Sequence, residues 1–169
     1  MTIAFEELRP EDLQMNVFSR IGRDWMLITA GPVEDCNTMT ASWGGLGVLW
    51  HRNVSFVFVR PVRWTYRFME KHPVYTLSFF DEEHRGALQL CGSRSGRDTD
   101  KIRDAGLTPF PTPENGTGFT QARLVLECRK LHSQDLDPSR FLDPSILGNY
   151  PDRDFHRLYI GEILNCLTR

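Results

Sequence analysis

The chain has 169 residues, of which 40% are hydrophobic, and its 20 Lys and Arg against 22 Asp and Glu give a formal net charge of -2. This length suits one compact domain over residues 1–169, with a core large enough to need no disulfide framework. The charge balance leaves no excess of cations for phosphates, so we expect no nucleic acid partner. The amino terminus is acidic and no apolar stretch is long enough to span a bilayer, so we expect a soluble cytoplasmic protein without membrane contact.

The cysteines form no C-x-x-C pair, which argues against a structural zinc site and a dense disulfide scaffold. We therefore predict free thiols and no metal. The cysteines concerned are Cys36, Cys91, Cys128 and Cys166.

The first strands are predicted at residues 25–30 and 54–59, where β-branched, aromatic and aliphatic residues run up to Gly31-Pro32 and Arg60-Pro61. Residues 37–43 between them are predicted to form a hydroxyl-rich loop. The glycines that follow, from Gly44 to Gly47, indicate a sharp turn or a close backbone approach.

Short helices are predicted at residues 65–71, stopped by Pro73, at 87–91, and within 98–104. A strand is predicted at residues 74–80, directly after the first of these helices.

In the last third of the chain, the Pro-rich residues 109–116 predict a surface loop and residues 122–131 a long strand. Alternation from His156 to Leu164 predicts a final strand with His156, Leu158, Ile160, Glu162 and Leu164 on one face. Five or six strands with short helices predict a mostly β, antiparallel barrel or sandwich. No G-x-G-x-x-G follows a strand, which argues against a dinucleotide-binding fold.

Three segments have the composition of anion sites. Residues 37–43 combine hydroxyls, an amide and small residues that leave N–H groups accessible, although such a segment also satisfies its own backbone as a turn. Residues 60–66 place arginines at a predicted helix start, where the alternative is a cap with solvated cations. Residues 92–101 place Gly, Ser and cations before another helix, where the alternative is a solvated loop.

The order of four motifs resembles the flavin reductase-like family, including its flavoredoxin-type members. The motifs are Asn37-Thr38-Met39-Thr40-Ala41-Ser42-Trp43-Gly44, Arg60-Pro61-x-Arg63-x-Thr65, Ser95-Gly96-Arg97-Asp98-x-Asp100-Lys101 and His156-x-x-x-x-Gly161-Glu162-Ile163. Together they run through about four fifths of the chain.

This resemblance implies an FMN-binding split β-barrel that forms a homodimer, with flavin near the subunit interface and NAD(P)H as hydride donor. It assigns Met39, Thr40, Ala41, Ser42 and Trp43 to the isoalloxazine and ribityl chain. It assigns Arg60, Arg63, Thr65, Ser95, Gly96, Arg97 and Lys101 to the phosphate. This division suits FMN, which has a phosphate dianion and a flat ring with polar edges.

His156 occupies the position at which related flavin reductases carry a histidine in a Gly-Asp-His segment, but here Asp154-Phe155 precede it. We assign it a catalytic role beside nicotinamide or flavin, with a hydrogen-bonded structural histidine as the alternative. Among the tryptophans, Trp43 is the one predicted to stack on flavin, because tryptophans at strand ends commonly serve packing.

Two functions remain open from the sequence. One is NAD(P)H-dependent reduction of flavin, with flavin passed to an oxygenase or electrons passed onward. The other is a non-enzymatic FMN electron carrier of flavoredoxin type that a partner protein reduces. A binding module without flavin is a third reading, which requires the motif matches to be accidental.

Overall fold

A computed structural model describes residues 5–169 of the chain. Its centre is an antiparallel sheet of eight strands in the order β3-β2-β6-β9-β10-β5-β4, with β1 also paired to β10. A separate pair joins β7 to β8. The strands are β1 (Glu6–Glu7), β2 (Met26–Ala30), β3 (Asn37–Ala41), β4 (Gly44–Leu49), β5 (Arg52–Val59), β6 (Val74–Phe79), β7 (Pro109–Pro111), β8 (Thr117–Phe119), β9 (Leu124–Asp135) and β10 (Arg157–Thr168).

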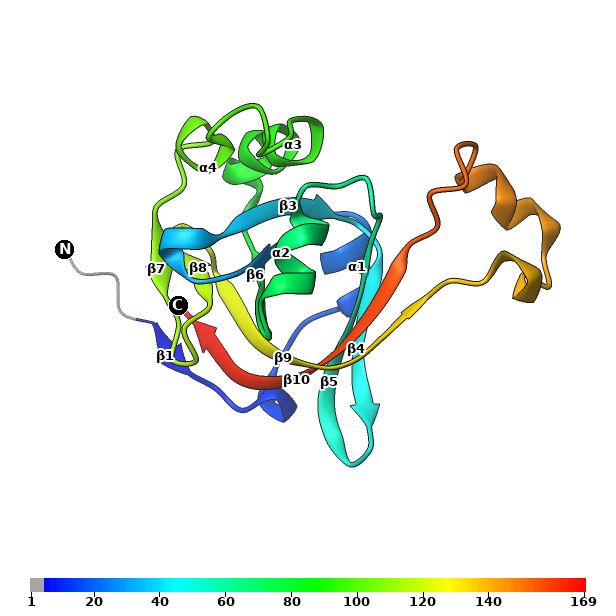
Figure 1. Cartoon of the computed structure of the whole chain (residues 1–169). Coiled ribbons are helices and arrows are strands. Elements are labelled where there is room, and N and C mark those ends of the chain that lie inside the picture. The colour runs from blue at the N-terminus through cyan, green and yellow to red at the C-terminus, as the bar shows by residue number, and fades with distance from the viewer. Residues whose placement is uncertain (1–4) are drawn as a thin grey trace.

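The helices are short, which with the sheet confirms the prediction of a mostly β, antiparallel fold. Figure 1 shows α3 and α4 together beyond β3, whereas the segment between β9 and β10 projects away from the sheet. The α-helices are α1 (Val17–Gly22), α2 (Thr65–Lys71), α3 (Arg85–Ser93) and α4 (Lys101–Asp104). Turns of 3-10 helix lie at Pro10–Asp12, Val33–Asp35, Glu82–His84, Pro138–Arg140 and Pro144–Asn149. No helix in residues 5–169 is long and apolar enough to cross a membrane.

The core lies inside the curved sheet, where Ile28, Leu77 and Leu126 of neighbouring strands are at most 1% exposed. Burying each such side chain contributes about 1.5–3 kcal/mol. Gly161 of β10 makes room in this core, because a Cβ there would lie 2.3 Å from the Tyr75 hydroxyl oxygen. The glycine of the fourth motif therefore has a packing role.

The helix predicted at residues 65–71 is present with those bounds, and the elements predicted at 25–30, 54–59, 74–80, 87–91 and 122–131 are present with shifted ends. The final strand is also present, but register shifts at Ile160/Gly161 and Ile163/Asn165 interrupt its predicted alternation. The helix predicted within residues 98–104 begins at Lys101, because the Asp100 carboxylate accepts from the Arg103 N–H and caps it.

Other predictions were wrong. Residues 37–41 form β3, paired along its length with β2. The glycine segment from Gly44 forms β4 at the opposite edge of the sheet, not a turn, but the alternative of a close backbone approach holds at Gly44, where a Cβ would lie 2.8 Å from Phe56 O. Within the predicted surface loop at 109–116, Pro109–Pro111 is β7, since prolines are tolerated on a short edge strand. The count of five or six strands was too low because polar β3 and glycine-rich β4 lack the usual strand composition.

Candidate functional site

The β3 segment places its polar side chains according to strand geometry. Thr38 is buried and its hydroxyl bonds to Ile28 O, while the Thr40 hydroxyl donates to Leu88 O of α3 at 2.5 Å. Ser42, just beyond the strand, makes no side-chain hydrogen bond within residues 5–169 and is half-buried. Of the segment's hydroxyls, Ser42 is thus the one left to meet a ligand.

Two adjoining cavities open beside this segment, and we call them together the β3 cleft. Their volumes are about 180 and 320 Å³, and both are lined by Thr40, Ser42 and Arg63. Together they reach the range of roughly 300–1,000 Å³ that is typical of small-molecule sites. The other lining residues are Met39, Ala41, Trp43, Phe58, Arg60 and His156 in the first, and Trp25, Leu88, Gln89, Gly92 and Ser93 in the second.

Two cations converge on the carbonyl of Cys91, at the α3 side of the cleft. Arg63 donates to it through Nη2 at 3.4 Å, and Lys101 donates through Nζ at 3.4 Å. Lys101 is only 3% exposed and its other acceptor is the Arg94 carbonyl at 3.3 Å. In the part of the chain that the structure describes, no carboxylate lies within 4.0 Å of either cation.

The pKa values of these cations reflect that lack of partners. Burial, with a smaller contribution from Arg63, lowers the pKa of Lys101 to about 8. Burial and the charge of Arg60 lower the pKa of Arg63, which stays protonated because a guanidinium does not lose its charge in proteins. A buried cation without a counter-charge is costly unless an anion compensates it, so this pair favours a bound anion.

A third cavity, of about 380 Å³, lies beside α4 and is lined by Asn37, Gly96, Arg97 and Lys101 among others. A Cβ at Gly96 would lie 2.0 Å from the Asn37 side-chain oxygen, so glycine lets this loop approach β3. Arg97 is exposed and its guanidinium lies 4.9 Å from the Trp64 ring centroid. Asp98 and Asp100 also line this cavity, which makes it less suited to a phosphate than the surroundings of Arg63.

Two of the residues assigned to phosphate line none of these three cavities. Thr65 is 1% exposed and its hydroxyl accepts from the Asn37 amide at 2.7 Å, which ties α2 to β3. The Ser95 hydroxyl accepts from the Arg97 backbone N–H at 3.2 Å and shapes its own loop. Both side chains therefore support the site indirectly, without lining it.

Arg60 lines the cleft but already has an anionic partner. Its Nη1 atom contacts both carboxylate oxygens of Asp154 at 2.8 and 2.9 Å, and its Nη2 donates to Asn149 O at 2.8 Å. The guanidinium also lies 5.0 Å from the Tyr150 ring centroid. Arg60 therefore anchors the projecting β9–β10 segment more than it offers a free cation.

His156 lies at the wall of the cleft, 7% exposed, with its ring centroid 5.1 Å from that of Trp43. Burial, followed by the charge of Arg60, lowers its pKa to about 4. The imidazole is therefore neutral at pH 7. Trp43 itself is 46% exposed, so its ring is available for contact at the cleft.

Sequence reasoning missed several lining residues. Phe58 follows the alternation of β5 and precedes the Arg60 motif by two residues, so strand periodicity would have placed it on the same face. Leu88 and Gln89 of α3 reach the cleft only through the packing of α3 on β3, for which the sequence has no signal.

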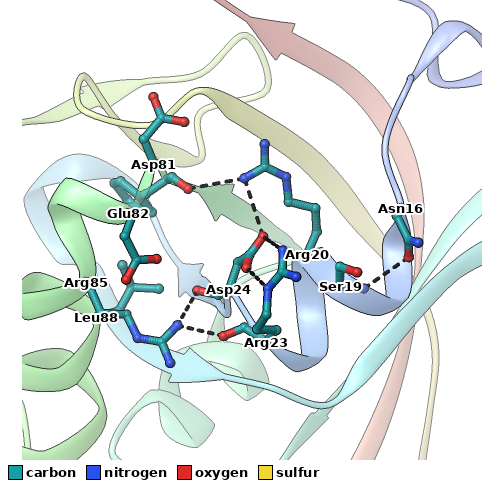
Figure 2. A pocket seen from close by; sticks show the side chains of 10 residues that line it. Asn16, Ser19, Arg20, Arg23, Asp24, Asp81, Glu82, Arg85 and Leu88 are labelled. Carbon is teal, nitrogen blue, oxygen red and sulfur yellow. Dashed lines mark hydrogen bonds and ion pairs between the residues drawn. The ribbon is translucent and has the colours of Figure 1, made fainter.

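A fourth cavity, of about 460 Å³, lies away from β3 and is shown in Figure 2; we call it the Asp24 cavity. Its cations are already partnered: the Asp24 carboxylate lies 2.8 Å from Arg23 Nε and 3.7 Å from Arg20 Nη1. Arg85 donates to the carbonyls of Arg23 and Asp24 and stacks 3.3 Å from the Trp25 ring centroid. This cavity thus has less need of an anionic ligand.

The donors of the β3 cleft fit a phosphorylated ring compound such as FMN. Arg63 lines the cleft and Lys101, which lines the adjoining third cavity, shares the Cys91 carbonyl with it; within residues 5–169 neither cation has a carboxylate partner. Ser42 supplies a hydroxyl, and Trp43 supplies an exposed aromatic face. Apolar walls with a few polar groups suit a flat ring, and a cationic end suits a phosphate.

Comparisons with known proteins bear on this arrangement. A family model described as "Flavin reductase like domain" matches residues 18–169. The FMN-binding domain of a flavin reductase-like enzyme from Shewanella baltica is similar in structure, with a TM-score of 0.71 and 15% identity over 98% of this chain and 77% of that chain. This likeness confirms the predicted split-barrel fold.

Two further structures are similar. Flavoredoxin of Desulfovibrio vulgaris has a TM-score of 0.67 and 20% identity, over 86% of this chain and 69% of that chain. An NADH:FAD oxidoreductase from Streptomyces globisporus has a TM-score of 0.67 and 14% identity, over 86% and 74%. At these identities the likeness establishes the fold alone. No curated protein matches the sequence significantly.

Proposed function

The chain belongs to the flavin reductase-like family, and we propose that it is an FMN-binding oxidoreductase that transfers a hydride from NAD(P)H to flavin. The observation that carries this proposal is a pair of cations beside the β3 cleft, half-buried Arg63 and buried Lys101, for which residues 5–169 supply no carboxylate partner. When bound, the flavin supplies the redox chemistry. The chain supplies orientation and electrostatics.

In this proposal Arg63 and Lys101 hold the phosphate, and Arg97 adds positive charge from the neighbouring loop. Ser42 donates to the polar edge of the ring or to the ribityl chain. The backbone and apolar parts of Met39, Thr40 and Ala41 form one wall, with Trp43 stacked at the ring end. Thr65, Ser95 and Gly96 act indirectly, by fixing Asn37 and the loop that carries Arg97.

Hydride transfer between nicotinamide and flavin requires no nucleophile and no protein acid. The residues at the cleft then serve to bind and to orient two flat rings and to exclude water. The NADH:FAD oxidoreductase among the similar structures supports this reading. The test is oxidation of NADH or NADPH by purified protein, with and without added FMN, and we expect turnover that depends on flavin.

A second candidate is an FMN electron carrier that a partner protein reduces, and the structural likeness to a flavoredoxin favours it. Both functions use the same flavin site. Stoichiometric FMN in a protein that oxidises neither nicotinamide would favour the carrier. Colourless protein that does not bind added FMN would contradict both functions.

We also propose that the protein is a homodimer and that its redox partner is an oxygenase or an electron-transfer protein. The dimer has support in large apolar side chains near the edge strand β4, where Val48 is 71% and Trp50 is 54% exposed. Trp43, between β3 and β4, is 46% exposed. A measured mass in solution equal to one chain, in protein that still binds FMN, would contradict the dimer.

A further inference from the structure

The projecting segment between β9 and β10 returns to the β3 cleft through a buried contact between Tyr150 and His156. The Tyr150 hydroxyl lies 2.7 Å from His156 Nδ1, and the two side chains belong to residues that are 6% and 7% exposed. His156 Nε2 makes no hydrogen bond within residues 5–169 and is not enclosed by protein, although its residue lines the cleft. Nδ1 is thus held by the Tyr150 hydroxyl, whereas Nε2 is available to a ligand.

The donors and acceptors available around His156 determine which nitrogen of its imidazole carries the proton. In the described residues the Tyr150 hydroxyl has no partner other than Nδ1. If Nδ1–H donated to it, the phenolic hydrogen would be left unpaired in a buried position, which costs about 1–3 kcal/mol. If the hydroxyl donates, both groups are satisfied, and the neutral ring carries its hydrogen on Nε2.

The charged groups around this pair hold it in place. Arg60, at the end of β5, stacks on the Tyr150 ring and pairs with Asp154, two residues before His156. Aromatic contacts with Phe155, at 5.0 Å between centroids, and with Phe141, at 6.1 Å, brace Tyr150 from the projecting segment. Trp43 and Phe58 pack on His156 from the cleft side. The imidazole therefore has little freedom to rotate.

We propose that Tyr150 is a positioning residue that fixes His156 as a neutral Nε2–H donor pointing into the β3 cleft. The group this donor would recognise is a hydrogen-bond acceptor at a ring edge, a carbonyl oxygen or an unprotonated nitrogen. A fixed donor there also stabilises negative charge that develops on a ring as it accepts electrons. The inference rests on the proposed function for its purpose, but the tautomer itself belongs to the protein without flavin.

The direct test is nitrogen-15 NMR of the imidazole in flavin-free full-length protein at pH 7. We expect Nδ1 to show the shift of an unprotonated nitrogen and Nε2 that of an N–H. In Tyr150→Phe the population of the Nδ1–H tautomer should rise, because Nδ1 loses the hydroxyl that donates to it. The matched control is Tyr159→Phe, because Tyr159 is also buried but its hydroxyl donates to Glu70 at 2.6 Å. A protonated Nδ1 in the unaltered protein, or an unchanged tautomer in Tyr150→Phe, would overturn the proposal.

A second measurement tests the direction of the effect in protein loaded with FMN. Tyr150→Phe should make the bound flavin harder to reduce, a shift to more negative potential, while Tyr159→Phe should leave the potential unchanged. An equal shift in both variants would overturn the positioning role. If the tautomer is as expected but the protein binds no FMN, the proposed function fails while Tyr150 still positions His156.

Discussion

Arginine side chains gather around both the Asp24 cavity and the β3 cleft, yet the two regions treat positive charge differently. Around the Asp24 cavity, Arg20 and Arg23 share the carboxylate of Asp24 and Arg85 binds backbone carbonyls (Figure 2). At the cleft, the acceptors that residues 5–169 supply to Arg63 and Lys101 are backbone carbonyls: both donate to Cys91 O, and Lys101 also donates to Arg94 O. The Asp24 cavity, at about 460 Å³, is close in volume to the β3 cleft, whose two cavities measure about 180 and 320 Å³, so volume alone does not separate them.

Charge pairing distinguishes the regions better than size does. An exposed ion pair costs little and contributes between 0 and about 1 kcal/mol, so the Asp24 network is explained as surface structure. A buried, unpaired cation destabilises the fold and persists where it serves a ligand. The comparison therefore assigns anion binding to the cleft and leaves the Asp24 cavity with a structural role.

The largest effect is expected from Arg63→Met. Loss of a charge-assisted hydrogen bond to phosphate, worth about 1.5–3 kcal/mol, should weaken FMN binding by roughly 10- to 100-fold. Riboflavin, which lacks the phosphate, should bind as before, and both affinities can be measured by quenching of flavin fluorescence. An equal loss for the two flavins would remove the phosphate assignment.

A moderate effect is expected from pH through Lys101. With a pKa of about 8 in the flavin-free protein, its charge is present at pH 7 and largely lost at pH 9. The affinity for FMN should therefore fall several-fold between these values, while that for riboflavin stays constant and Lys101→Met shows no such fall.

The lowered pKa of Lys101 should also affect stability: the free energy of unfolding of the flavin-free protein should rise with pH, whereas the affinity for FMN falls. Because the pKa of Lys101 is lowered from 10.5 in the unfolded chain, the unfolded state binds more protons between pH 8 and pH 10.5. The contribution of this group to the free energy of unfolding should therefore become more favourable across that window. The contribution of Lys101 is obtained by comparing the free energy of unfolding of the flavin-free protein with that of Lys101→Met as a function of pH. The same pH dependence in both proteins would contradict the burial argument.

The smallest effect on flavin is expected from Arg20→Met, the matched change at the Asp24 cavity. It should leave FMN affinity within about twofold and lower the free energy of unfolding by less than about 1 kcal/mol. Arg63→Met should show the reverse, with weaker FMN binding and no loss of stability in flavin-free protein. Chemical denaturation of the two variants measures their free energies of unfolding. A loss of FMN affinity in Arg20→Met would contradict the distinction between the Asp24 cavity and the β3 cleft.

Much of this arrangement was predictable from the sequence, but not how each side chain is used. Runs such as Val54–Val59 identify core strands because apolar, β-branched residues suit a sheet. The polar composition of residues 37–41 did not indicate a strand, yet these residues form β3, whose threonines hydrogen-bond to Ile28 O and to α3. The motifs identified Arg60 and Arg63 alike, whereas only the fold shows that Asp154, distant in sequence, neutralises Arg60. Tyr150 belongs to no motif and reaches His156 through the turn of the projecting segment.

Arg63 and Lys101 form the proposed phosphate site of a bound flavin. The most direct test is a crystal structure of the protein with FMN. We predict phosphate oxygens within hydrogen-bond distance of the Arg63 guanidinium and Lys101 Nζ, with the ring in the β3 cleft beside Ser42 and Trp43. A phosphate bound instead among Arg20, Arg23 and Arg85, or a flavin that contacts neither Arg63 nor Lys101, would contradict this account.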